Sequence, residues 1–329
     1  MGIVHRARHR LTGRQAALKI IDPQPELGVP PDELRARFQR EIDVLARVRS
    51  TRVVEVFEHG ELSGDRLWLA MELAEGSALD TVLVVQGPLP ARKVLAIGLE
   101  LAKALGDVHA AGLVHRDVKP GNIVVADLEG KPRLKLVDFG IARALAGASG
   151  STAERLTLTG MVLGSLGYMA PEQSSGASEP DPTIDVYACG VTLFELATGR
   201  LPFDGPTAAA FALQHRSRPV PSVVPLLRVD DGAGDALDGV LARALAKTPG
   251  ERPPDGGALA REIGLALRVD PAVRTTVDRV RARVAEVQHH VEEEAGVRPR
   301  ARVTKGRVAA AIAAALGLAT LVWGLVGHR

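Results

Sequence analysis

The sequence predicts an α+β protein with two lobes, a small β-rich N-terminal lobe and a larger helical C-terminal lobe. Short apolar runs separated by turn signals fill the first part of the chain, for example at 16–21 and 67–73. After Pro88 the pattern becomes mainly helical and begins with a long amphipathic run near 91–111. Because strands come first and helices follow, the two kinds of element are expected to form separate lobes.

One helix is expected inside the small lobe. Residues 31–49 carry apolar side chains at three- and four-residue steps, and Pro30-Pro31-Asp32 marks the start of that run. Strand candidates lie on both sides of it, at 3–4, 16–21, 53–57 and 67–73.

Composition and charge exclude several classes of protein. The 329 residues include 41 basic and 39 acidic ones, a net charge of +2, which argues against nucleic acid as a partner. The single cysteine, Cys189, cannot form an internal disulfide and fits a reducing compartment. No apolar stretch follows Met1, so no secretory signal peptide is predicted.

Two motifs in the middle of the chain carry the chemistry. They are His115-Arg116-Asp117-Val118-Lys119-Pro120-Gly121-Asn122 and Asp138-Phe139-Gly140. The first closely matches the catalytic loop of protein kinases, and the second matches their metal-binding motif. On these residues the chain resembles the Hanks-type serine/threonine protein kinases of bacteria, over about residues 2–267. The resemblance implies the two-lobed protein kinase fold, ATP and Mg²⁺ (or Mn²⁺) as cofactors, and proteins as substrates.

The resemblance gives each polar residue of these motifs a role. Phosphoryl transfer needs alignment and neutralisation of charge more than covalent help. Asp117 is expected to orient the substrate hydroxyl and accept its proton, while Lys119 reaches the γ-phosphate. Asn122 and Asp138 are expected to supply oxygen ligands to the metal. A single Asp or Asn in such a loop is usually a turn former, but the whole constellation favours the catalytic interpretation.

Further residues match the ATP site of the family. Lys19, in Ala16-Ala17-Leu18-Lys19, is expected to contact the α- and β-phosphates and to be held by an ion pair with Glu41. Ala17 is small, which lets adenine lie close to the strand. The remaining assignments are the apolar walls Val4 and Val124, the back of the pocket at Met71, and the hinge backbone at Glu72 and Ala74.

The stretch from Gly164 to Glu172 resembles the end of the kinase activation segment. Glu172 is expected to pair with Arg252, and Asp185 to anchor the backbone of the catalytic loop. This long segment disfavours a small-molecule kinase of the same fold.

Two threonines before Gly164, Thr157 and Thr159, are predicted autophosphorylation sites. Their place matches the paired threonines of bacterial relatives, and Arg116 offers a cation for the added phosphate. The alternative is that both threonines are simply solvated in a loop.

The glycine-rich loop of the family is matched only at its end. Gly2 and Val4 correspond to its final glycine and valine, so Gly2 is assigned to ATP binding. Either the true start lies upstream of an internal Met1, which the intact remainder favours, or the protein lacks half of its phosphate lid. The missing glycines favour a pseudokinase or scaffold, whereas Lys19 and Asp117 favour an enzyme.

Two segments follow the predicted kinase domain, residues 1–268. Within 269–307, valines at 273, 277, 280, 284, 287 and 291 have the spacing of a short coiled coil and predict a homodimer contact. The alternative is an amphipathic helix that packs on the kinase or on a membrane surface.

The uncharged run 308–327 is long enough to span a bilayer, although a buried Ala-rich helix is the alternative. Basic residues at 298–307 precede it, which predicts a single-pass protein of the cell membrane with its kinase domain in the cytoplasm.

Overall fold

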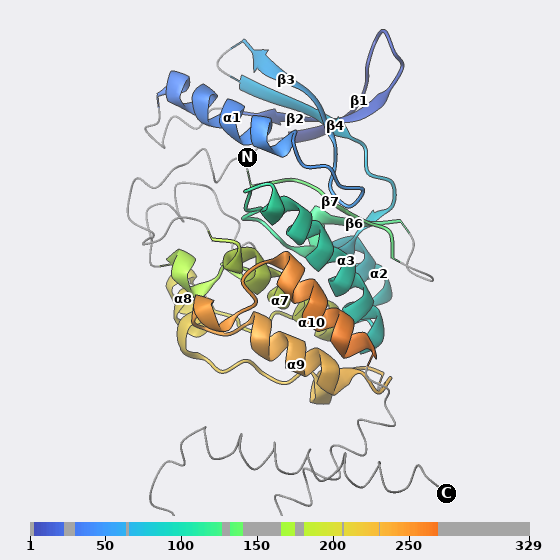
Figure 1. The fold of residues 1–329 in the computed structure, drawn as a ribbon, viewed down its shortest axis with the longest axis vertical. Helices are drawn as coiled ribbons and strands as arrows, with labels where there is room; N and C mark the ends of the chain where they lie inside the picture. The colour runs from blue at the N-terminus through green and yellow to red at the C-terminus, as the bar shows by residue number, and fades with distance from the viewer. Residues whose placement is uncertain are drawn as a thin grey trace, which may run out of the picture. The chain divides into compact units, whose positions relative to one another are not determined.

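The computed structural model describes residues 3–22, 30–63, 66–126, 132–140, 166–174, 181–205, 207–229 and 231–268. Within this part of the chain, the strands of the first sheet and one helix form a small lobe, and the other helices form a larger one (Figure 1). The predicted α+β, two-lobed architecture is confirmed.

The small lobe is a four-stranded antiparallel sheet in the order β1-β2-β4-β3. Its strands are β1 (Ile3–Arg8), β2 (Gln15–Ile21), β3 (Val56–Leu62) and β4 (Arg66–Glu72). The helix α1 (Pro31–Leu45) begins with Pro31 at its first position, where a proline costs no hydrogen bond. It buries Leu34, Phe38 and Ile42, which share one face at four-residue steps.

The predicted strand at 53–57 is wrong at its start. Val53 and Val54 are both buried and do not belong to the small-lobe sheet. Val53 instead forms an isolated parallel bridge with Leu136, and the Val54 amide donates to the Leu136 carbonyl at 3.2 Å. Two adjacent buried valines cannot both face one side of a sheet, and here they tie the chain of the small lobe to the second sheet.

That second sheet has three short strands and leads into the site. It consists of β5 (Ser77–Ala78), β6 (Ile123–Val125) and β7 (Leu134–Leu136), paired antiparallel in that order. The catalytic-loop motif enters β6 and the metal motif leaves β7, so their pairing brings the two motifs together.

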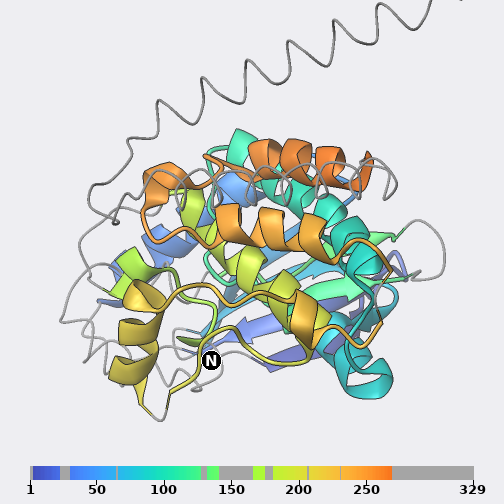
Figure 2. The same cartoon turned by 90° about the horizontal axis from the view of Figure 1, so that it is seen from below.

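The larger lobe is built around a buried helix. Its helices are α2 (Leu79–Gln86), α3 (Ala91–Ala110), α7 (Thr183–Thr198), α8 (Ala208–Ser217), α9 (Gly234–Ala244) and α10 (Gly256–Arg268). All residues of α7 except Glu195 and Thr198 are buried, because α3, α9 and α10 pack against it. Figure 2 shows α9 and α10 lying side by side in this lobe.

Short 3₁₀ turns, each containing a proline, connect the larger elements. They are η2 (Pro120–Asn122), η3 (Pro171–Ser174), η4 (Val224–Leu226) and η5 (Pro249–Glu251). Two of them, η2 and η3, carry residues of the predicted site.

Several predictions fall on residues that the structure does not describe. These are Gly2, Thr157, Thr159, the valine run 273–291 and the apolar run 308–327. Across the described ranges, no helix combines the length and the apolar character needed to cross a bilayer. The predictions for these segments therefore stay predictions.

Candidate active site

Asp185 holds the backbone of the catalytic loop in place. It lies in the first turn of α7 and is almost fully buried. Its two carboxylate oxygens accept the amides of His115 at 2.6 Å and Arg116 at 2.8 Å. Arg116 has a left-handed φ of 66°, a strained conformation that such anchoring can maintain. The predicted anchoring role of Asp185 is confirmed.

The loop places two polar side chains, those of Lys119 and Asn122, around one carboxylate oxygen of Asp117. Lys119 donates to Asp117 Oδ2 at 2.7 Å, and Asn122 donates to the same oxygen at 2.9 Å. Asn122 also donates to the Asp117 backbone carbonyl at 2.7 Å. The turn η2 brings Asn122 back toward Asp117, since the Asn122 amide bonds to the Lys119 carbonyl. The structure therefore joins these three residues in one hydrogen-bonded unit.

Backbone hydrogen bonds fasten the metal motif to this unit. The Val137 amide donates to the Asn122 carbonyl at 3.0 Å, and the Gly140 amide donates to the His115 carbonyl at 3.0 Å. Between them Asp138 has a left-handed φ of 59°. Asp138 is thus fixed beside Asn122, its predicted partner as a metal ligand.

His115 packs between the catalytic loop and the metal motif. Burial lowers the pKa of its imidazole, which keeps the ring neutral. Its Nε2 donates to the Val137 carbonyl, its Nδ1 accepts the Asp117 amide, and its ring lies 4.6 Å from the Phe139 ring. The ring therefore links the two motifs and has no spare nitrogen for proton transfer.

The predicted ion pair between Lys19 and Glu41 is not the one that the structure contains. Lys19 Nζ pairs with Asp138, and no ion pair joins Lys19 to Glu41 among the described residues. Glu41 lies half-buried on α1, where it lines a small hollow together with Arg116 and Phe139. Because the Lys19 ammonium is buried it needs a nearby anion, and the Asp138 carboxylate supplies it. This pair connects β2 of the small lobe to the end of β7.

The residues present fit a magnesium-bound nucleotide. Asn122 uses its amide NH₂ for Asp117, which leaves its amide oxygen as a ligand. The Asp138 side chain is about one-third exposed, at 34%, and Mg²⁺ prefers such hard oxygen ligands. Asn122 and Asp138 would hold the metal, and Lys19 would lie beside the phosphates. When bound, the metal neutralises charge on the phosphates.

The predicted adenine-contacting residues lie on several strands and the segment after β4. Ala17 of β2 and Met71 of β4 are direct cross-strand partners, and Met71 is buried. Val4 lies opposite Lys19 on β1, and Val124 lies on β6 opposite Lys135. Glu72 ends β4 and Ala74 follows it.

Both the backbone and the side chain of Glu72 form hydrogen bonds to other parts of the protein. The Glu72 amide donates to the Glu55 carbonyl at 2.8 Å, while its carboxylate accepts Lys135 at 2.6 Å. These contacts fix the segment in which the sequence predicts the hinge.

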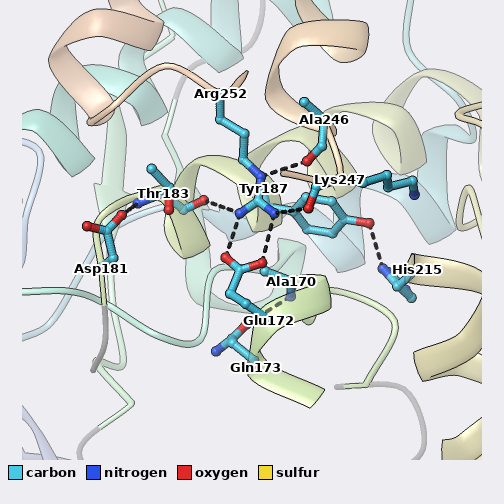
Figure 3. A network of polar contacts seen from close by, with 10 residues as sticks. All are labelled: Ala170, Glu172, Gln173, Asp181, Thr183, Tyr187, His215, Ala246, Lys247 and Arg252. Carbon is cyan, nitrogen blue, oxygen red and sulfur yellow. Dashed lines mark hydrogen bonds and ion pairs between the residues drawn. The ribbon is translucent and has the colours of Figure 1, made fainter. Parts of the chain in front are cut away.

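The predicted pair between Glu172 and Arg252 is confirmed and belongs to a larger network (Figure 3). The Arg252 guanidinium binds both Glu172 oxygens, at 2.7 and 2.8 Å, in a bidentate arrangement. It also donates to the carbonyls of Thr183, Ala246 and Lys247. Acceptors from several segments of the chain thus satisfy the fully buried Arg252 guanidinium.

Sequence reasoning missed a second part of this network, formed by Tyr187, His215 and Lys247. The Tyr187 hydroxyl lies 2.8 Å from His215 Nδ1, and the Lys247 ammonium lies 4.0 Å from the centre of the Phe203 ring. Phe211 and His215 are four residues apart, which places both on one buried face of α8. This spacing is visible in the sequence and could have indicated that His215 is buried.

Comparisons with known proteins agree with this geometry. The family model of the protein kinase domain matches residues 1–254. Serine/threonine-protein kinase PknL of Mycobacterium tuberculosis is 36% identical over 250 residues, 76% of this chain and 58% of the relative. Serine/threonine-protein kinase pkn3 of Myxococcus xanthus is 35% identical over 80% of this chain and 47% of its own length. This chain therefore spans about half the length of these relatives.

A solved structure gives the same result. The kinase domain of Mycobacterium tuberculosis PknI is 31% identical, with a TM-score of 0.57 over 81% of this chain and 91% of that one. The chain belongs to the protein kinase family, and within it to the Hanks-type kinases of bacteria.

Proposed function

We propose that the chain is a serine/threonine protein kinase, which transfers the γ-phosphate of ATP to hydroxyl groups of proteins. The observation that carries this proposal is the Asp117 carboxylate, which accepts both Lys119 and Asn122. Backbone hydrogen bonds connect this unit to Asp138, which in turn pairs with Lys19. The names of the relatives, serine/threonine-protein kinases, support the same conclusion.

The residues of this unit divide the work of phosphoryl transfer. Asp117 has a second carboxylate oxygen, Oδ1, which orients the incoming hydroxyl and accepts its proton. Lys119 and Asn122 fix the carboxylate by their bonds to Oδ2, so that it is aligned before the substrate arrives. The ammonium groups of Lys119 and Lys19 stabilise negative charge that develops on the transferred phosphoryl group.

The proposal includes autophosphorylation and attachment to the cell membrane. Thr157 and Thr159 are the proposed acceptors, supported by their place before Gly164 and by Arg116, which precedes Asp117 in the sequence and offers a cation for a phosphate. The uncharged run 308–327 is the proposed single membrane span, and the basic residues before it support a cytoplasmic kinase domain. The valine run 273–291 is the proposed contact of a homodimer.

A scaffold function is the second candidate, and one observation favours it. The ion pair between Lys19 and Asp138 uses two groups that an active kinase needs for ATP and metal. A protein that kept this pair permanently would bind partners through its fold and transfer no phosphate.

An assay with labelled ATP and Mg²⁺ tests the proposal directly. The full chain, purified in detergent, is compared with Asp138→Asn and with Asp43→Asn, the same chemical change at an exposed position of α1. We expect phosphate on the parent, on the Asp43→Asn variant and on a generic protein substrate, and at least a 100-fold loss in Asp138→Asn. Mass spectrometry is expected to find the label on Thr157 and Thr159.

A parent that binds ATP in calorimetry without transferring phosphate would support the scaffold. Phosphate found only outside Thr157 and Thr159 would remove the assignment of the acceptors and leave the kinase activity in place.

A further inference from the structure

His215 lies buried where several parts of the larger lobe meet. It belongs to α8, and only 2% of it is exposed. Its Nδ1 lies 2.8 Å from the Tyr187 hydroxyl of α7, and its ring meets the Phe203 ring edge-on at 5.0 Å. Figure 3 shows the Tyr187 hydroxyl pointing at the His215 ring. Such complete burial of an imidazole on a short helix indicates a specific contact rather than a solvated surface residue.

The charges around His215 keep its ring neutral. Burial, and then the Lys247 ammonium, lower the pKa of His215 to about 4. Lys247 has its own pKa lowered to about 8, by burial and by the Arg252 guanidinium. Burial raises the pKa of the Tyr187 phenol, so this hydroxyl keeps its proton. At neutral pH the cluster thus pairs a neutral imidazole with a protonated phenol.

The hydrogen bond between these two groups depends on the tautomer of the imidazole. When the Tyr187 hydroxyl donates to Nδ1, the ring carries its proton on Nε2. His215 Nε2 is buried and makes no hydrogen bond to the residues that the structure describes. A buried donor without a partner destabilises the folded state, so a hydrogen bond from this N–H to a nearby acceptor would be stabilising.

Gly167 is the neighbour that can provide this acceptor. Its backbone raises the pKa of His215, which is the direction that a carbonyl oxygen facing a ring N–H produces. Gly167 belongs to the segment 166–170, whose ends Leu166 and Ala170 are buried. Helix α8 also packs against η3, which directly follows this segment, so His215 and Gly167 come from neighbouring parts of the structure.

The segment 166–170 borders the catalytic carboxylate. Tyr168 and Asp117 line the same small hollow, and the Tyr168 hydroxyl donates to Glu195 of α7. The segment that resembles the end of the activation segment therefore lies beside Asp117. The position of Gly167 therefore influences how a protein substrate is presented to Asp117.

We propose that His215 is a positioning residue for the protein substrate. Its Nε2–H takes the Gly167 carbonyl as its partner and so holds the segment 166–170 between α8 and Asp117. This inference rests on the proposed kinase function and adds the residue that controls access of the protein substrate. ATP binding is expected to be unaffected, because the described contacts of Lys19, Asn122 and Asp138 do not involve this cluster.

Two amide variants separate the roles of the two ring nitrogens. In His215→Gln the side-chain amide reaches the position of Nε2, whereas in His215→Asn it reaches only the position of Nδ1. His215→Phe keeps the ring and removes both nitrogens. Tyr187→Phe removes the hydroxyl that fixes the proton on Nε2.

Hydrogen exchange gives a test that does not depend on activity. The amides of 166–173 are followed by mass spectrometry in the full chain. We expect exchange to speed up about tenfold in His215→Asn and His215→Phe, the factor that corresponds to one lost hydrogen bond, and to stay near the parent rate in His215→Gln. Equal rates in the Asn and Gln variants would overturn the proposal, and so would unchanged rates in all of them.

Steady-state kinetics test the consequence for the substrate. The KM for a protein substrate is expected to rise about tenfold in His215→Asn, His215→Phe and Tyr187→Phe, with the KM for ATP unchanged and His215→Gln near the parent. A parallel rise in both KM values would contradict a positioning role. If the parent transfers no phosphate, the kinase proposal fails, and hydrogen exchange alone then decides the contact with Gly167.

Discussion

Buried imidazoles in this protein act as neutral connectors. His115 joins the catalytic loop to the metal motif, and His215 joins α8 to α7. Burial lowers the pKa of both rings, to about 4 for His215. An unfolded histidine has a pKa near 6.5, so the unfolded chain binds more protons than the folded chain between about pH 6.5 and pH 4. Stability therefore falls as the pH falls through this window.

The pH dependence gives a prediction for single residues. At pH 5, His215 is expected to cost the parent about 2 kcal/mol of unfolding free energy relative to pH 7.5. His215→Gln has no titrating ring, so between pH 7.5 and pH 5 its unfolding free energy should fall by about 2 kcal/mol less than that of the parent. Urea unfolding of both chains at pH 7.5 and pH 5 measures the difference. Equal losses in parent and variant would mean that the pKa of His215 is near its ordinary value.

The Lys19 ammonium shows what residue chemistry alone leaves open. Sequence reasoning expected Glu41 to be its partner, and a buried lysine does need an anion nearby. By charge alone, the carboxylates of Glu41 and Asp138 are equally suitable partners for the Lys19 ammonium. The structure selects Asp138, which the end of β7 brings to the Lys19 ammonium.

Among the elements, α3 and α10 make an unusually close contact through glycine. A Cβ atom on Gly256 would lie 2.4 Å from the Gly106 nitrogen and 2.6 Å from the Ala102 carbonyl oxygen. These are backbone atoms, which cannot rotate away as a side chain can. The helices α3 and α10 can therefore pack this closely only because Gly256 has no side chain.

A pair of glycine substitutions tests this contact between elements. Gly256→Ala is expected to lower the unfolding free energy by about 1–3 kcal/mol, because α10 must move off α3. Gly239→Ala, in the exposed middle of α9 with nothing within 4 Å of the new methyl, should raise it by about 0.5–1 kcal/mol. Thermal melting followed by circular dichroism distinguishes the two, and a stable Gly256→Ala variant would contradict the close packing.

On the scale of the whole molecule, Arg252 connects distant parts of the larger lobe. Its guanidinium binds Glu172 of η3, the Thr183 carbonyl at the start of α7, and the loop carbonyls of Ala246 and Lys247. Buried charges of this kind are costly to expose singly, since removal of one partner leaves the other in a medium of low dielectric constant. The network therefore joins the end of the activation segment to the core of the larger lobe.

Removal of this connection should weaken the whole larger lobe. Arg252→Met is expected to lower the unfolding free energy by about 3–5 kcal/mol. Arg243→Met is the control, because Arg243 pairs with Glu262 and its side chain is about half exposed. This variant should change the unfolding free energy by less than about 1 kcal/mol. Urea unfolding compares the two variants. Similar losses in both would mean that burial does not control the contribution of Arg252.

Motif residues are the part of the site that could be predicted from the sequence. Asp117, Lys119 and Asn122 were found by their resemblance to the kinase catalytic loop, and the structure joins them by hydrogen bonds. Asp185 and the pair of Glu172 with Arg252 were also expected and occur. The remainder depends on contacts between segments that are far apart along the chain.

The sequence by itself determined the two lobes, through the periodicity of their elements, and the family, through motifs that each lie within a few positions of the chain. Only the tertiary structure decided that Lys19 pairs with Asp138, that Val53 and Val54 bridge to Leu136, and that His215 meets Tyr187. The physical reason is the same in all three cases. Which partner a buried group finds depends on how whole elements pack, and packing is settled by the burial of many side chains together rather than by the local pattern.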